Sequence, residues 1–241
     1  MCNQEKMSKT ELSIPKMLLL GFAPGLVVLF VAIIFSSPFF GIELNLLLSG
    51  VLAMLFGHII TELGILKFIA YKENKKIKDI IFYKNKTPIK RMFIYVTISL
   101  IIALTAFILL SQYELKIWER FIIFPDWFRM DKIDFSEIKY LRTSIILYFL
   151  LNGFIVPFIE EIYFRGYLLP RMDRFGKASP IINVLIFSIY HFFSPFELIT
   201  RIVALTPYTY SVWKNRDIKI GILVHCLMNI LGGIGLIMLL L

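Results

Sequence analysis

Two adjacent acidic residues, Glu160 and Glu161, interrupt a long apolar stretch of the sequence. Because a charged side chain is costly within a membrane, an isolated ionisable group there suggests a function. Three further polar residues lie in later apolar segments, namely His191, His225 and Asn229. Carboxylates and imidazoles can move protons, and an amide can donate a hydrogen bond to a developing negative charge. This combination of residue types favours hydrolysis over a simple proton relay.

Helical spacing separates the roles of the two glutamates. Glu161 and Arg165 are four residues apart, so they share one face of a helix and can form an ion pair. Glu160 points about a quarter-turn away and has no cation at that spacing, which leaves it available as a general base. His225 and Asn229 are also four residues apart, and they can therefore reach one reacting centre together.

The elements that must position these residues are membrane-spanning helices. The chain has 241 residues and is 58% hydrophobic, above the roughly 45–50% that is usual for soluble domains. We therefore predict an all-α integral membrane protein, a polytopic bundle of about 7–8 transmembrane helices in the single domain 1–241. The eighth span requires part of 113–142 to re-enter the bilayer. The seven apolar spans are 17–37, 44–71, 92–111, 143–159, 181–193, 198–213 and 218–241.

The net charge of +9 is concentrated between these spans. Segment 71–91 holds eight Lys and Arg residues against two acidic ones, and segments 170–177 and 214–219 hold three basic residues each. The positive-inside rule places such segments in the cytoplasm. We therefore expect a cytoplasmic N-terminus and a location in the cell membrane. We interpret the basic run as facing lipid headgroups and expect no nucleic-acid partner.

This topology brings the polar residues to similar depths. At about 1.5 Å per residue, Glu160 is about 15 Å from its cytoplasmic turn, and His191 is about 16–17 Å from its own. His225 and Asn229 lie about 10 Å and 17 Å from the start of their segment. We expect the three segments to bring these side chains together, at a site reached from the cytoplasmic half of the membrane.

At these residues the chain resembles the CPBP family, the CAAX prenyl proteases and bacteriocin-processing (Abi) membrane proteins. The resemblance covers roughly 143–241, which we take as the catalytic core, whereas the first 140 residues match only as generic spans. The family motifs EExxxR, FxxxH and HxxxN are matched in family order by Glu160, Glu161 and Arg165, by Phe187 and His191, and by His225 and Asn229.

The resemblance implies an intramembrane endopeptidase that hydrolyses a peptide bond of a membrane-associated substrate, prenylated peptides among them. In that family the residue at Glu160 activates a water with help from the histidine at His191, while those at His225 and Asn229 form the oxyanion side. The expected partners are the peptide substrate and the lipid bilayer. The supporting positions are Glu161, Arg165 and Phe187.

The residue types alone leave metal dependence open. Glu160, His191 and His225 could hold zinc, with water as the fourth ligand. However, HExxH spacing is absent from the sequence, and Asn229 is a poor zinc ligand. We therefore expect no cofactor and keep zinc as the alternative.

Two other function classes stay open. A non-proteolytic membrane protein, either a bacteriocin-immunity factor or a scaffold, would fit the same family, and a proton-coupled transporter would also use buried glutamates and histidines. His58 and Glu62 form a further polar pair four residues apart in an early span. We interpret them as a structural hydrogen-bonded pair, with a role in lining the site as the second interpretation.

Overall fold

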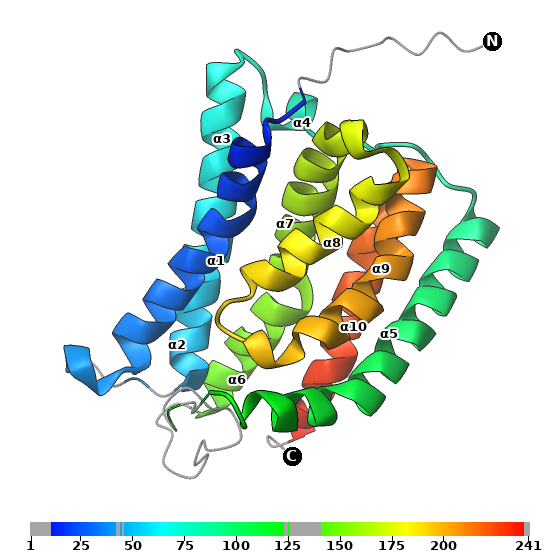
Figure 1. Cartoon of the computed structure of the whole chain (residues 1–241). Coiled ribbons are helices and arrows are strands. Elements are labelled where there is room, and N and C mark those ends of the chain that lie inside the picture. The colour runs from blue at the N-terminus through cyan, green and yellow to red at the C-terminus, as the bar shows by residue number, and fades with distance from the viewer. Residues whose placement is uncertain (1–10, 42–43, 45, 123–124, 126–140, 239–241) are drawn as a thin grey trace, which may run out of the picture.

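A computed structural model describes residues 11–41, 44, 46–122, 125 and 141–238, which form a helical bundle (Figure 1). Within these residues there is no strand, although Lys84 and Asp217 form an isolated β-bridge. Segments η2, η6 and η7 are π-helical, and η1, η8 and η9 are 3₁₀-helical. In chain order the helices are α1 (Ile14–Ser36), η1 (Pro38–Phe40), α2 (Leu46–Ala53), η2 (Met54–Ile60), α3 (Thr61–Lys72), α4 (Ile77–Ile80), α5 (Ile89–Trp118), α6 (Leu141–Leu150), η6 (Leu151–Ile155), α7 (Val156–Glu160), η7 (Glu161–Leu168), η8 (Leu169–Ala178), α8 (Ser179–Tyr190), η9 (Pro195–Glu197), α9 (Leu198–Asn215) and α10 (Lys219–Met238).

Five helical stretches of the described chain are long and apolar enough to cross a membrane. The fourth of them runs from α6 to α8 and is not one continuous helix, because Gly176 has a φ of 53° and interrupts it before α8. With 12 residues, α8 is about 18 Å long, which is less than the roughly 30 Å of a hydrocarbon core. The five stretches are Ile14–Ser36, Leu47–Lys72, Ile89–Trp118, Leu141–Tyr190 and Lys219–Met238.

The all-α membrane fold is therefore confirmed, whereas the count of seven or eight spans stays a prediction. The segments expected to form the fifth and sixth spans, 181–193 and 198–213, correspond to α8 and α9. Neither helix by itself is one of the five stretches that could cross a membrane. Most of the segment considered for an eighth span, 113–142, lies outside the described residues. The division into one domain with a core at 143–241 also stays a prediction.

The helices from α6 to α10 occupy the middle of the bundle. Helices α1 to α3 lie on one side of them and α5 lies on the other (Figure 1). Helix α9 packs against both α5 and α8, while α1 packs against α2, η2 and α8. The segment that carries the motifs is thus enclosed by the N-terminal helices.

Glycines let α1 approach its neighbours closely. A Cβ atom added to Gly25 would overlap the backbone carbonyl of Tyr190 at the end of α8, and one added to Gly57 of η2 would overlap Val28 of α1. Small residues at such contacts are common in membrane bundles, because they allow helix backbones to pack tightly. Through these two contacts, α1 sets the positions of η2 and the end of α8.

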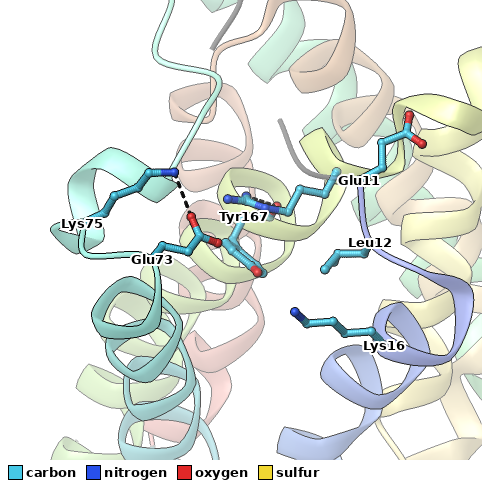
Figure 2. Close-up of a pocket in the computed structure, with 7 residues that line it drawn as sticks. Glu11, Leu12, Lys16, Glu73, Lys75 and Tyr167 are labelled. Atoms are coloured by element: carbon cyan, nitrogen blue, oxygen red, sulfur yellow. Dashed lines mark hydrogen bonds and ion pairs between the residues drawn. The ribbon is translucent and has the colours of Figure 1, made fainter. Parts of the chain in front are cut away.

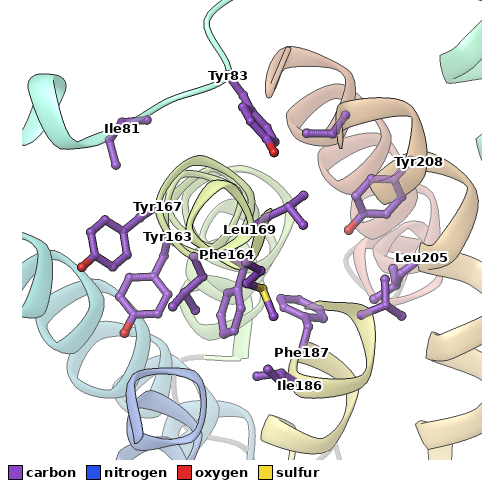
Figure 3. Close-up of a cluster of buried hydrophobic side chains, with 14 of the residues drawn as sticks. Ile81, Tyr83, Tyr163, Phe164, Tyr167, Leu169, Ile186, Phe187, Leu205 and Tyr208 are labelled. Atoms are coloured by element: carbon purple, nitrogen blue, oxygen red, sulfur yellow. The ribbon is translucent and has the colours of Figure 1, made fainter. Parts of the chain in front are cut away.

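The bundle core beneath the motifs is rich in aromatic residues. Tyr163, Phe164 and Tyr167 of η7 are buried together with Phe187 of α8 and Tyr208 of α9 (Figure 3). The rings of Phe164 and Phe187 pack edge to face, with their centroids 4.8 Å apart at 88°, an arrangement that aromatic pairs favour. These contacts fix the relative positions of η7, α8 and α9.

The three basic segments of the sequence meet at one end of the bundle, the upper end in Figure 1. Nη1 of Arg216 lies 3.3 Å from Oδ1 of Asp173, and Lys84 pairs with Asp217 through the isolated bridge. A common end is what the positive-inside rule requires of three cytoplasmic loops. The orientation of that end in a membrane stays a prediction.

Candidate active site

The two glutamates lie where α7 passes into the π-helical segment η7. Glu160 is 2% exposed and Glu161 is 0% exposed. π-Helical turns widen a helix locally and occur frequently at functional sites. The other two π-helical segments, η2 and η6, contain His58 and Asn152 and also pack against α7. Three irregular helical turns therefore surround the carboxylate pair.

Glu161 forms the predicted ion pair with Arg165. Nη1 of Arg165 lies 3.3 Å from Oε1 of Glu161, and this contact is electrostatic rather than a directed hydrogen bond. The Tyr208 hydroxyl donates to the same oxygen at 3.0 Å, and Nη2 of Arg165 donates to that hydroxyl at 3.0 Å and to Thr209 at 3.3 Å. The guanidinium carbon also lies 4.2 Å from the centre of the Phe187 ring. Together these contacts offset the desolvation of a fully buried charge pair.

His225 on α10 contacts both glutamates. Its Nδ1 lies 3.0 Å from Oε1 of Glu161, and its Nε2 lies 3.7 Å from Oε2 of Glu160. An ionised Glu161 beside Arg165 can only accept hydrogen bonds, so Nδ1 of His225 is the donor and Nε2 faces Glu160. Gly221 lies one turn earlier on α10, where a Cβ atom would overlap the Glu161 carboxylate. Glycine at this position therefore makes room for the contact.

Asn229 is held at a gap that a proline leaves in the backbone hydrogen bonds. In η6 the amide of Val156 donates to the carbonyl of Leu151, five residues earlier. The next amide in that register is Pro157, which has no N–H. The carbonyl of Asn152 is instead satisfied by Nδ2 of Asn229, at 2.9 Å. This amide nitrogen keeps a second hydrogen for another acceptor.

His191 immediately follows the C-terminal end of α8. Its Nδ1 lies 2.8 Å from the carbonyl oxygen of Phe187, so Nδ1 donates and Nε2 is left to face other groups. The rings of Tyr190 and Phe187 lie 4.4 Å and 4.8 Å from the imidazole, centre to centre. Within the described residues, the polar contacts of Glu160 are with Tyr190, His58 and His225. The role expected for His191 beside Glu160 stays a prediction.

Two of these contacts of Glu160 were not predicted. The Tyr190 hydroxyl donates to Oε1 of Glu160, and Nδ1 of His58 lies 3.4 Å from the same oxygen. The predicted pair of His58 with Glu62 is present, with Nδ1 3.3 Å from Oε1. His58 could be noticed in the sequence because it is a polar residue in an apolar span. Helical spacing could not show that Glu160 is its neighbour. Tyr190 carried no such signal, because a tyrosine in an apolar segment is ordinary.

One group of the described residues could hold a metal ion, and it consists of His58, Glu62 and Glu160. One ligand atom from each lies within 4.8 Å of the others. The group shares only Glu160 with the zinc alternative, which uses His191 and His225. The presence or absence of a metal therefore stays a prediction.

A pocket of about 380 Å³ opens at the end of the bundle that carries the basic segments (Figure 2). None of the motif residues lines it, so we do not assign the chemistry to this pocket. Its lining consists of Glu11, Leu12, Lys16, Glu73, Lys75, Tyr167 and Arg171.

A family model described as type II CAAX prenyl endopeptidase Rce1-like matches residues 142–231. The match covers less than half of the chain, and this segment is similar to the CAAX protease family. The predicted resemblance is thus confirmed, and the matched segment contains all three motifs. No curated protein and no solved structure matches the chain. The family supports a CAAX-protease-like peptidase embedded in a membrane, while His58 and Glu62 lie outside the matched residues.

Proposed function

We propose that the protein is an intramembrane glutamate endopeptidase that cleaves membrane-associated peptides, prenylated ones included, without a metal cofactor. The proposal rests on the groups that surround the Glu160 carboxylate. This carboxylate is buried, lies 3.7 Å from the His225 imidazole, and has no lysine or arginine among its contacts in the described chain. A carboxylate that is not neutralised by a permanent cation is suited to take up a proton.

In the proposed reaction, Glu160 takes a proton from a water molecule while the water oxygen attacks the carbonyl carbon of the scissile bond. His191 helps to orient this water through its Nε2. The proton then passes from Glu160 to the leaving nitrogen as the C–N bond breaks, which yields a carboxylic acid and an amine. General-base catalysis of this kind typically contributes about 10²–10⁴-fold to the rate.

His225 and Asn229 form the proposed oxyanion side. Because Nδ1 of His225 donates to Glu161, its Nε2 can donate to an oxyanion only from the protonated imidazolium form. The Glu161 carboxylate supplies a counter-charge for that form. Asn229 adds the second hydrogen of its amide nitrogen, and its contact with Asn152 holds it in place.

The same proposal places the site in the cell membrane and makes it accessible from the cytoplasmic half. The convergence of the three basic segments at one end of the bundle supports a cytoplasmic location for that end. A substrate anchored in the inner leaflet would then present its peptide close to the membrane surface.

The deciding experiment is cleavage of a prenylated CaaX peptide by purified protein in nanodiscs, compared with the Glu160→Ala variant. We expect cleavage by the wild type and none by the variant. An unprenylated peptide of the same sequence tests whether the lipid is required. If the wild type cleaves neither peptide, the non-proteolytic alternatives, an immunity factor or a scaffold, would gain support.

A further inference from the structure

We infer that Glu62, His58 and Tyr190 form a positioning chain for the carboxylate of Glu160, built largely from helices outside the family match. The inference rests on the proposed function, because it takes Glu160 as the base. We call these three residues the Glu62–His58–Tyr190 chain. Its role is to hold one oxygen of Glu160 in place, so that the other oxygen can accept the proton.

The two oxygens of Glu160 have different neighbours. Oε1 accepts a hydrogen bond from the Tyr190 hydroxyl and lies 3.4 Å from Nδ1 of His58. Oε2 faces Nε2 of His225 at 3.7 Å, which exceeds a direct hydrogen bond and is a separation at which a water can bridge two groups. One oxygen is therefore anchored, and the other is directed toward the motif residues.

The anchor continues away from Glu160 through a line of hydrogen-bonding groups. Nδ1 of His58 lies 3.0 Å from the Tyr190 hydroxyl oxygen and 3.3 Å from Oε1 of Glu62. The hydroxyl hydrogen of Tyr190 is used on Glu160, so the ring N–H of His58 points toward Tyr190 and Glu62. A base oriented by a second residue, which is oriented by a third, is the general logic of catalytic triads.

The scaffold around this chain leaves little freedom. His58 and Tyr190 are each less than 5% exposed, and Glu62 is fully buried. The His58 ring packs edge-on against Tyr190, at 6.0 Å and 81°. Gly57 and Gly25 bring α1 against η2 and against the carbonyl of Tyr190. Side chains locked in this way hold a catalytic group more precisely than a flexible loop would.

Glu62 and Glu160 both contact the His58 imidazole in apolar surroundings, where two ionised carboxylates would repel each other. The other ionisable groups around Glu160 are Glu161 and Arg165 on its own helix, His225 on α10, and Arg201 and Tyr208 on α9.

The test uses Tyr190→Phe and Glu62→Gln, with kcat, KM and the pH dependence of kcat measured in nanodiscs on the CaaX peptide. We expect kcat to fall about 10- to 100-fold with KM nearly unchanged, because a hydrogen bond to a charged group is lost or weakened. In Tyr190→Phe the acid limb of the pH profile should move to higher pH, since the Glu160 carboxylate loses a hydrogen-bond donor.

Two controls separate positioning from stability. Tyr208→Phe removes the same atom from the neighbouring glutamate, Glu161. Glu114→Gln alters another buried carboxylate, which accepts hydrogen bonds from the backbone of Ile199 and Thr200 at the start of α9. Both controls should lower thermal stability, and Glu114→Gln should leave the pH at which activity rises unchanged.

The outcomes distinguish the inference from the proposed function. If Glu160→Gln keeps wild-type activity, the proposed function is wrong. If Glu160→Gln is inactive but Tyr190→Phe and Glu62→Gln match the wild type, only the positioning chain is wrong. A fall in kcat that tracks thermal stability, with no change in the pH profile, would also overturn it. Stoichiometric metal that is lost in Glu62→Gln would show that these residues form a metal site rather than the Glu62–His58–Tyr190 chain.

Discussion

Glu160 and Glu161 are neighbours in the sequence, yet their surroundings differ in kind. Glu161 contacts a guanidinium, a phenol and an imidazole, and its ion pair with Arg165 is fully buried. Glu160 contacts a phenol and two imidazoles, and no permanent cation among the described residues reaches it. A quarter-turn of helix thus separates a carboxylate fixed as a counter-ion from one that is free to exchange a proton. Substitutions on each side of the pair test that difference.

The largest effect is expected from Glu160→Gln. The amide is nearly isosteric but cannot accept the proton, so turnover should fall by about 10²–10⁴-fold or more while the protein still inserts and folds. Peptide cleavage and a melting curve in nanodiscs measure the two properties separately. Retained activity in a folded Glu160→Gln protein would remove the assignment of Glu160 as the base.

The next effect concerns stability on the Glu161 side. Arg165→Ala leaves a buried carboxylate without its cation, and breaking such a pair typically costs about 3–5 kcal/mol. The double variant Glu161→Gln, Arg165→Met removes both charges and should recover part of the lost stability. Denaturant titration in mixed micelles would compare the three proteins.

The opposite result would change the interpretation of this pair. An Arg165→Ala protein that is as stable as the wild type but inactive would point to direct contact between Arg165 and substrate. The Glu161–Arg165 pair would then take part in the reaction, and it would no longer serve only to stabilise the fold.

The local part of this site could be predicted from the sequence. The Glu161–Arg165 pair follows from helical spacing, and the approach of His225 to Glu160 agrees with similar depths along two spans. Both arguments use only the rise and turn of a helix. They succeed because these residues lie on helical segments, and because their depths were counted from the same end of the bundle.

The rest depended on packing that hydropathy does not specify. The contacts of Glu160 with His58 and Tyr190 require α1, η2 and α8 to pack around α7. Glycines permit this packing, but a glycine in the sequence does not show which helix will approach it. The bond from Asn229 to Asn152 depends on a π-helical register that ends at Pro157. Likewise, α8 begins at Ser179 and ends at Tyr190, before the end of the predicted span 181–193.

A smaller effect is expected at the proposed oxyanion side, which is formed by His225 and Asn229 rather than by the two glutamates. Asn229→Ala removes one donor to the developing negative charge and leaves the Asn152 carbonyl without its partner. Loss of one such donor typically lowers kcat by about 10²–10³-fold. Single-turnover kinetics should show the loss in the chemical step, with KM little changed. A rise in KM at constant kcat would indicate that Asn229 binds substrate instead.

The smallest effect should come from removing metal ions. The three groups that could hold a cation, His58, Glu62 and Glu160, already contact one another or Tyr190. A cation would therefore have to displace hydrogen bonds that the side chains make among themselves, and it would neutralise the proposed base. We expect exhaustive chelation to leave activity within about twofold of its starting value, and elemental analysis to find no stoichiometric metal. Zinc that tracks activity would overturn this expectation. Its loss in Glu62→Gln or in His191→Ala would then show whether it sits with the early helices or with the motif histidines.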